Sequence, residues 1–277
     1  MTASYLFAAI LRQWSKLNDR FKNMNISSLH SSRTRPAGIE LELCLENAEK
    51  SNHLKLSNSH RIFHARQSLF CAGDQFEGLY ILRSGSAKSF ITSIDGEEHI
   101  TKFYYPGDLL GVDGFDKHIY MENVFFLETS SVCLVKESEL NNLVKSSDDF
   151  RNCLLRSMSH ALVSDSSMMM CLSSCSSEQK LARFVLDLSE QFRSLRLSGT
   201  EFRLSMTRTD IANYMGMALE TVSRVFASFQ LKQIIRVQNR QLTILDFDAL
   251  NRIVLKDQCL NKVASNLPTE KCISAFC

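Results

Sequence analysis

A short run of residues near the C-terminus constrains the fold of this chain more than any other part of it. Ile211 and Ala212 have the spacing of the inner face of a helix, and Gly216 follows Ala212 by four residues. A glycine there allows a positive φ or a close approach of two backbones, as the tight turn between crossing helices requires. The residues that would seat a second helix on the first are apolar: Met217, Val222 and Val225. The pattern predicts a helix-turn-helix with its second helix over 218–231, and the alternative is an αα-hairpin inside a larger helical domain.

The second predicted helix presents polar side chains on one face. Glu220, Ser223 and Arg224 stand at i, i+3 and i+4, so their side chains point the same way. Arg can bind guanine O6 and N7 with two hydrogen bonds, Glu can accept one from cytosine N4, and Ser can bond to a base or a phosphate. A Glu–Arg pair at this spacing is also an ordinary surface ion pair. The place of these residues on the helix after the turn favours DNA base contacts.

Positive charge gathers around the same two helices. Residues 203–240 hold six basic and two acidic side chains, a net charge of +4, whereas the whole chain carries only +2. A local basic surface is what binding to DNA phosphates requires. Arg208 and Thr209 begin the first helix, whose N-terminus also favours an anion. We therefore predict phosphate contacts from Arg208, Thr209 and Thr221.

A long helix is predicted over residues 149–172, which contain neither glycine nor proline. Its heptad seam predicts a two-stranded coiled coil that joins two copies of the chain, and the alternative is a single helix packed on its own β-domain. The seam consists of Leu155, Met158, Leu162, Asp165, Met169 and Leu172. Asp165 interrupts it, and a carboxylate that faces its symmetry mate weakens a dimer or fixes its register.

Residues 61–136 have a different texture. Short runs rich in β-branched and aromatic residues alternate with turn residues, and seven of the ten glycines lie between 71 and 114. These runs predict strands at residues 78–82, 88–92, 99–105, 124–127 and 132–135. Together they indicate a small antiparallel β-roll, of the barrel or jelly-roll kind, with a two-residue hairpin turn at Asp95-Gly96.

The chain as a whole is predicted to be an α+β protein. In chain order we expect a weakly ordered extension, the β-roll, the dimerisation helix, the DNA-binding domain and a tail, at residues 1–55, 56–147, 148–174, 175–255 and 256–277. Within the DNA-binding domain, an amphipathic helix over 178–195 follows a Ser-rich hinge, and two strands around Asn239-Arg240 form a wing. Met1 and Met24 both remain open as the start of the protein.

These segments resemble the CRP/FNR family of transcription regulators, and most closely its FNR branch. The motifs that carry the resemblance are Phe-Arg-Leu at 202–204, Met-Thr-Arg-Thr-Asp-Ile-Ala-Asn-Tyr-Met-Gly at 206–216, Glu-Thr-Val-Ser-Arg at 220–224, and β-roll runs at 69–74, 79–85 and 106–111. The resemblance covers about residues 56–255. It implies a homodimer with a winged helix-turn-helix that reads a TTGAT-like inverted repeat, with half-sites about 34 Å apart. It further implies RNA polymerase as a partner and Asp165 as a residue that tunes dimerisation.

The β-roll of this family holds the sensor, and this chain departs from both versions of it. A cyclic AMP site uses an Arg after the Gly-Asp turn together with a Gly-Glu pair, but no Arg lies between Arg83 and Arg151, and Gly111-Val-Asp113 replaces Gly-Glu. An FNR-type iron–sulfur cluster needs four thiolates. Cys133 stands where the β-roll ligand would be, yet only Cys44 precedes the β-roll. The sequence argues against both cofactors, and Cys133 is more typical of a buried strand cysteine.

The effector therefore stays open, as does the choice between activator and repressor. Cys171 and Cys175 lie one helical turn apart and could form a soft-metal or redox site, although two thiols at a helix end are more often incidental. The nine cysteines are scattered and odd in number, and no signal peptide is recognisable, which favours reduced thiols in the cytoplasm. The apolar run at 5–11 is too short to span a bilayer, so no membrane partner is predicted.

Two other classes of protein compete with the regulator. A cupin-like jelly roll binds a metal through clustered histidines and a carboxylate, but the seven histidines form no such cluster in the β-roll segment. A sensor scaffold would dimerise without reading DNA, and binding to a palindromic duplex would separate it from a regulator. No nucleophile elbow or P-loop is present, so the sequence predicts neither an enzyme nor a metal site.

Overall fold

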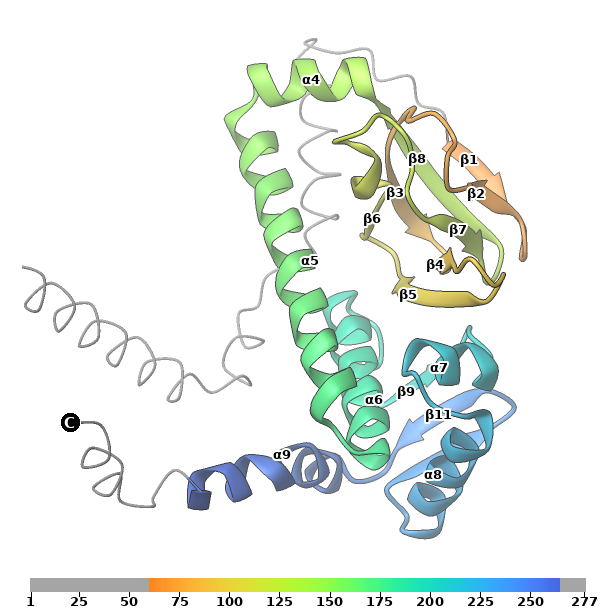
Figure 1. Ribbon diagram of the computed structural model, residues 1–277, viewed down its shortest axis with the longest axis vertical. Helices are drawn as coiled ribbons and strands as arrows, with labels where there is room; N and C mark the ends of the chain where they lie inside the picture. Colours follow the sequence, from red (N-terminus) through yellow and green to blue (C-terminus); the bar gives the residue numbers. More distant parts are fainter. Residues whose placement is uncertain (1–59, 265–277) are drawn as a thin grey trace, which may run out of the picture. The chain divides into compact units, whose positions relative to one another are not determined.

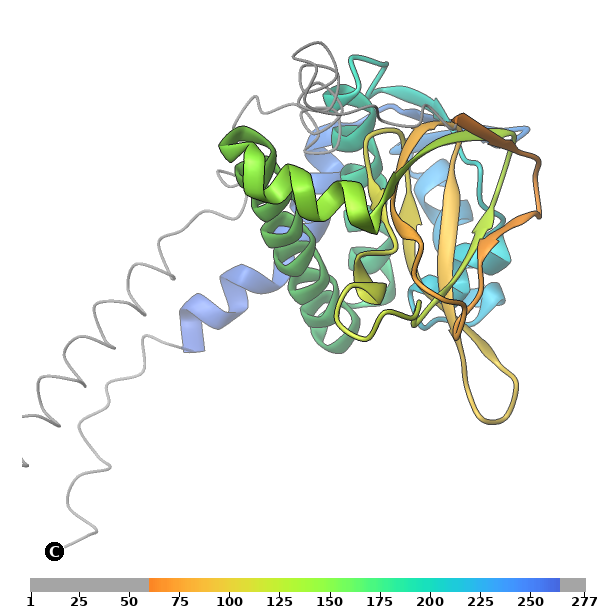
Figure 2. The ribbon, with the colours of Figure 1, turned by 90° about the horizontal axis from the view of Figure 1, so that it is seen from above.

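The computed structural model describes residues 60–264, and the predicted extension at 1–55 and the last part of the predicted tail lie outside these residues. Eight strands form two antiparallel sheets, with strand orders β1-β8-β3-β6 and β2-β7-β4-β5 (Figures 1 and 2). The strands are β1 (His60–Phe63), β2 (Ser68–Phe70), β3 (Gly78–Ser84), β4 (Ala87–Thr92), β5 (Glu98–Tyr104), β6 (Leu109–Leu110), β7 (Asn123–Phe126) and β8 (Ser130–Lys136). The five predicted strands are confirmed, while β1, β2 and β6 were not predicted.

The β-roll is built around β3, which is buried on both of its faces. Residues 78–82 of this strand are all buried, because β3 lies inside its sheet and α4 (Glu137–Ser146) packs against it. Gly78 begins the strand at φ 150°, and a Cβ atom there would lie 2.1 Å from the carbonyl oxygen of Val135. The close pairing of β3 with β8 therefore requires glycine at this position.

The turn between β4 and β5 differs from the prediction. Ser93 N donates to Glu97 O, and Gly96 N donates to Ser93 O, so the loop contains the three residues 94–96 rather than two. Gly96 has φ 82°. A three-residue hairpin loop that ends on a left-handed residue matches the twist of the strands just as a two-residue turn does, and the sequence signal Asp-Gly is common to both.

Two helices follow α4 and lead into the C-terminal domain. They are α5 (Asp148–Ser174) and α6 (Ser177–Ser194), and both were predicted. The hydroxyl of Ser147 accepts from Phe150 N at the start of α5, and Ser176 forms a capping box with Gln179 at the start of α6. The Ser-rich hinge is therefore explained by capping, because a serine at this place satisfies free N–H groups of the helix that follows.

The C-terminal domain is a helix-turn-helix with a small sheet. Its elements are β9 (Glu201–Arg203), α7 (Arg208–Tyr214), α8 (Leu219–Leu231), β10 (Ile235–Gln238), β11 (Gln241–Ile244) and α9 (Phe247–Ala264). The sheet order is β10-β11-β9, so the wing hairpin gains a third strand that was not predicted. Helix α9 extends to Ala264 and so enters the region, from residue 256, where the sequence predicted a tail. Leu250 of this helix is buried, and Ile253 and Val254 pack on the same core.

One apolar core runs from the β-roll into the C-terminal domain. Phe90, Ile100 and Phe103 on the outer face of the β4–β5 hairpin share it with the buried residues of α6, α7 and α8. A second core lies inside the β-roll and includes Phe150 of α5. The first core brings the helix-turn-helix against the β-roll, and this contact positions the surface described next. The predicted fold class is confirmed.

Candidate nucleic-acid interface

The first helix of the helix-turn-helix starts at a complete capping box. Thr207 Oγ1 accepts from Asp210 N at 3.1 Å, and Asp210 Oδ2 accepts from Thr207 N at 2.8 Å. The same carboxylate oxygen accepts the hydroxyl proton of Thr207 at 2.6 Å. These bonds satisfy two N–H groups that the first turn of a helix leaves free, which is why a helix of seven residues begins sharply at Arg208.

The turn between the helices is set by Gly216. Gly216 N donates to Asn213 O at 3.0 Å and Met217 N donates to Ala212 O at 2.9 Å, the bond pattern of a Schellman motif. Gly216 has φ 58°, and no atom would lie within 4 Å of an added Cβ. Of the two reasons that the sequence left open for this glycine, the positive φ is therefore the one that applies.

The second helix is held to the first by a buried seam and leaves its other face exposed. Ile211, Ala212 and Val222 are buried between the helices. Glu220, Ser223 and Arg224 are exposed on the far side of α8. Within residues 60–264, no hydrogen bond or ion pair joins Glu220 or Arg224 to another side chain, so the alternative of a Glu–Arg surface pair is not realised. Thr209 is exposed as well, and Thr221 is half-buried.

Arg208 has a different environment from the one expected for a phosphate contact. Its guanidinium Cζ lies 3.0 Å from the centre of the Phe226 ring, and its Nη1 is buried with no hydrogen-bond partner among the described residues. Burial lowers the pKa of Arg208 to about 10, so the side chain keeps its charge near neutral pH. The side chain therefore braces α7 on α8 and is less accessible than the sequence suggested.

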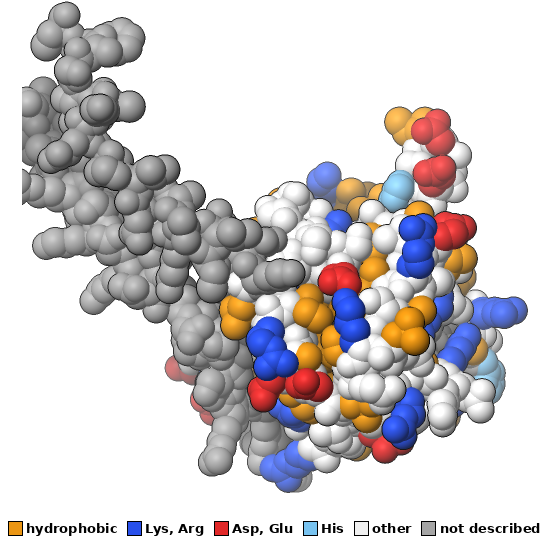
Figure 3. Space-filling view, turned by 90° about the horizontal axis from the view of Figure 1, so that it is seen from below, with side chains coloured by type: hydrophobic (Ala, Val, Ile, Leu, Met, Phe, Trp, Pro, Cys, Tyr) orange, Lys and Arg blue, Asp and Glu red, His pale blue; other side chains and the backbone are white. Residues whose placement is uncertain are grey.

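The wing completes the surface. Asn239 and Arg240 connect β10 to β11 with φ 48° and 69°, which is the two-residue hairpin that the sequence predicted. Arg240 Nη1 donates to Ser205 O at 3.4 Å and ties the wing to the segment before α7. Arg236 on β10 is exposed. Seen from below, this end of the described molecule carries Lys and Arg side chains spread across its face (Figure 3).

Two family models match this chain. Residues 179–253 match the Crp-like helix-turn-helix domain, and residues 60–147 match the cyclic nucleotide-binding domain. The transcriptional activator protein Anr of Pseudomonas protegens is 40% identical over 178 residues, which are 64% of this chain and 73% of Anr. Regulatory protein HlyX of Actinobacillus pleuropneumoniae is 41% identical over 187 residues, or 66% of this chain and 77% of HlyX.

The chain belongs to the CRP/FNR family. Among solved structures, FixK2 from Bradyrhizobium japonicum has the same fold, with a TM-score of 0.64 at 22% identity over 70% of this chain and 96% of FixK2. This CRP/FNR protein is a DNA-binding transcription regulator and not an enzyme, so the cupin-like alternative is excluded. Among residues 60–264, no helix has the length and apolar character needed to cross a membrane.

The sensor region of this CRP/FNR protein contains two half-buried carboxylates, Asp113 and Glu122. Asp113, which stands in the Gly-Glu position, accepts from Met121 N at 2.7 Å and from Glu122 N at 3.0 Å. Glu122 accepts from Thr101 Oγ1 at 3.1 Å. Burial is the main cause that raises the pKa of Glu122, and the nearby Asp113 and Asp165 carboxylates raise it further.

The candidate thiols are placed in ordinary protein surroundings. Cys133 is half-buried on β8 and packs against the β-roll core. Burial, together with a hydrogen bond to Cys175, raises the pKa of Cys171 to about 12, so this thiol stays protonated at neutral pH. Among the residues that the structure describes, no three His, Cys, Asp or Glu side chains are grouped so that they could hold a metal.

The predicted dimer seam lies on an open face of α5. Leu155, Leu162 and Met169 are 58%, 68% and 72% exposed, and Asp165 and Leu172 are exposed too. Met158 differs, because it is half-buried against the β-roll core. Apolar side chains that stay exposed at heptad spacing fit the expectation of a partner helix better than the alternative of a helix packed on its own β-roll.

Proposed function

We propose that the protein reads a TTGAT-like inverted repeat as a homodimer. The observation that carries this proposal is the free outer face of α8, where Glu220 and Arg224 are exposed and have no partner among the described side chains. Two ionic side chains with a fixed spacing and no internal use are suited to a C·G base pair in the major groove, with Ser223 beside them. The resemblance to the FNR branch supplies the half-site sequence.

Contacts with DNA phosphates come from the start of each helix. Thr209 and Thr221 are placed at the N-terminal ends of α7 and α8, where free N–H groups favour an anion. We retain Arg208 in this set because its guanidinium stays charged beside the same helix end. Because its guanidinium is stacked on Phe226, Arg208 would attract DNA phosphates through its charge more than through direct hydrogen bonds.

Dimerisation uses the exposed seam of α5. The seam residues Leu155, Leu162 and Met169 would bury their side chains against the same residues of a second copy. The two α8 helices would then lie about one turn of DNA apart, as an inverted repeat requires. RNA polymerase as partner and the cytoplasm as location follow from the family. The likeness to Anr, a transcriptional activator protein, supports an activating role.

Neither cyclic AMP nor an iron–sulfur cluster is proposed as the effector. A cyclic phosphate calls for a bidentate Arg, and the β-roll sequence has no Arg between Arg83 and Arg151. An FNR-type iron–sulfur cluster needs four thiolates, and Cys44 is the one cysteine that precedes the β-roll in the sequence. We therefore propose that DNA binding does not depend on either group.

The proposed function is tested by binding of the full chain, purified in air without added metal, to a duplex carrying TTGAT–N4–ATCAA. Fluorescence anisotropy would be measured beside a scrambled duplex and a duplex with one intact half-site, and sedimentation would report the oligomeric state. Tight binding to the complete site by a dimer is expected. A chain that stays monomeric, or binds all three duplexes equally, would contradict the proposal.

A further inference from the structure

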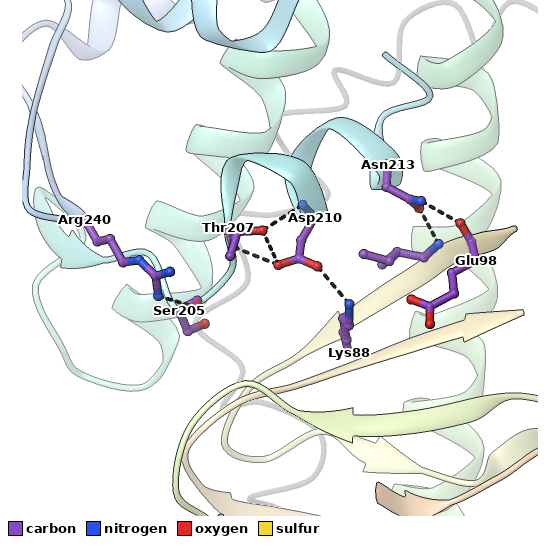
Figure 4. Close-up of polar contacts among 8 residues, drawn as sticks. Lys88, Glu98, Ser205, Thr207, Asp210, Asn213 and Arg240 are labelled. Atoms are coloured by element: carbon purple, nitrogen blue, oxygen red, sulfur yellow. Dashed lines mark hydrogen bonds and ion pairs between the residues drawn. The ribbon is translucent and has the colours of Figure 1, made fainter. Parts of the chain in front are cut away.

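The first helix of the helix-turn-helix is fastened to the β-roll by a shielded ion pair. Lys88 Nζ on β4 lies 2.8 Å from Asp210 Oδ1 on α7, and the two side chains are only 19% and 14% exposed (Figure 4). Asp210 divides its oxygens between two tasks, since Oδ2 completes the capping box with Thr207. Burial alone would raise the pKa of Asp210. The hydrogen bonds from Lys88 and Thr207 outweigh burial, so the pKa is lowered.

A second contact joins α7 to the edge of the sheet. Asn213 Oδ1 accepts from Ile100 N, and Asn213 Nδ2 donates to Glu98 O, each at 2.6 Å (Figure 4). The strand β5 is last in its sheet, so these backbone groups have no neighbouring strand. The carboxamide of Asn213 pairs with them as the backbone of another strand would, and it satisfies a donor and an acceptor at once.

Aromatic rings close the same contact. The ring of Tyr214, which ends α7, lies 5.0 Å from that of Phe103 on β5 and 6.1 Å from that of Phe184 on α6. All three belong to the core that continues from the β-roll into the C-terminal domain. Polar and apolar contacts therefore fix the orientation of α7 about more than one axis, which a single ion pair could not do.

The chain connection between the dimer helix and this domain is short and non-helical. Only Cys175 and Ser176 separate α5 from α6, and both have extended backbones, with ψ of 145° and 164°. Rotation about these two residues would swing the whole helix-turn-helix relative to α5. The contact of α7 with the β-roll opposes such a rotation, while the outer face of α8 stays exposed.

We propose that Lys88 and Asn213 are positioning residues for DNA recognition: they hold the reading helix at a fixed place relative to the dimer helix and so set the half-site spacing. This inference rests on the proposed homodimer. Lys88 binds Asp210 of α7 and Asn213 of α7 binds β5, so neither contact covers the outer face of α8. Loss of either contact would let the C-terminal domain take up several orientations relative to α5. Only a fraction of these orientations would fit a given half-site spacing.

The test compares the full-length protein with Lys88→Met and Asn213→Ala on duplexes in which the spacer of the inverted repeat runs from N2 to N6. Lys117→Met and Asn142→Ala are matched controls, since both residues are exposed on the β-roll and on α4. We expect each test variant to lose about tenfold in affinity at the best spacer but less than twofold at the others, so the preference for one spacer flattens. Lys88→Arg, which keeps the cation, should restore part of the preference.

Three results would separate the possible failures. A wild-type protein that has a sharp spacer optimum, with variants that keep the same optimum and affinity, would overturn the positioning role alone. Equal loss at every spacer, together with a lower thermal midpoint, would also overturn it and leave these residues as contributors to stability. A wild-type protein that is monomeric or has no spacer preference would refute the proposed homodimer instead.

Discussion

The two helices of the helix-turn-helix differ in whether their polar side chains have hydrogen-bond partners within the protein. On α7, Asp210 and Asn213 have every side-chain oxygen and nitrogen engaged, partly by the helix itself and partly by the β-roll. On α8, Glu220 and Arg224 are exposed and have no side-chain partner within the described part of the chain. A satisfied polar side chain fixes geometry, whereas an unsatisfied one at the surface is available to a molecule outside the protein.

This difference assigns roles within one small motif. We propose that the polar groups of α7 that contact the β-roll orient the domain, and that the polar groups on the outer side of α8 read the DNA. Arg208 lies between the two cases, because it is charged yet stacked on a ring of the other helix. The first substitution below removes Phe226, on whose packing both helices depend. The next removes Arg224 from the exposed face of α8, and a third removes Arg208, which is both charged and stacked.

The largest effect is expected from Phe226→Ala. Phe226 is 2% exposed, lies in the core behind α8 and carries the Arg208 guanidinium on its ring. Removal of this ring should lower the free energy of unfolding by about 3–5 kcal/mol, and both helices should lose their places. Urea unfolding followed by circular dichroism would measure it, with Leu231→Ala, which is 84% exposed on the same helix, as the control. A loss under about 1 kcal/mol would show that the two helices do not depend on this core.

Arg224→Ala should affect the reading side alone. We expect it to cost about 1–3 kcal/mol in binding to the complete site, to relax the preference at one base pair, and to leave unfolding unchanged. Binding titrations on a set of single-substitution duplexes would measure this, with Arg66→Ala, an exposed arginine of the β-roll, as the control. If specific and random DNA lost affinity equally, Arg224 would be a phosphate contact and the assignment of α8 would need revision.

The sequence predicts features that depend on neighbouring residues better than contacts between residues far apart in the chain. The turn glycine Gly216 and the exposed trio on α8 are consequences of spacing along one short segment, and the sequence predicted both the place of the turn and the exposure of the trio. The capping role of Thr207 was not predicted. The contact of Asn213 with Ile100 joins residues that are 113 positions apart, and no local pattern reports such a pairing. The same holds for the stacking of Arg208 on Phe226, because the basic residue alone suggested only a phosphate contact.

Arg208→Ala should have a smaller and mixed effect. Loss of the stacking on Phe226 should lower the free energy of unfolding by about 1 kcal/mol. Loss of the charge should reduce the slope of log affinity against log salt concentration by about one for every DNA sequence. Salt titrations on specific and random duplexes would measure the slope. An unchanged slope with reduced stability would make Arg208 a bracing residue only.

The smallest effect is expected on α5, where the contrast between satisfied and unsatisfied side chains recurs at Asp165. This carboxylate is exposed within a row of exposed apolar residues, and its charge contributes to the raised pKa of the half-buried Glu122. In the proposed homodimer it would approach its own symmetry mate, so its removal relieves repulsion between like charges. Asp165→Ala should therefore tighten the dimer about two- to fivefold, as measured by sedimentation equilibrium at low salt, and the gain should shrink as salt screens the charges. Asp149→Ala, which removes an exposed carboxylate from the first turn of the same helix, is the control. An unchanged dissociation constant for Asp165→Ala would mean that the carboxylates stay apart, and that the exposed row on α5 meets its partner in another register.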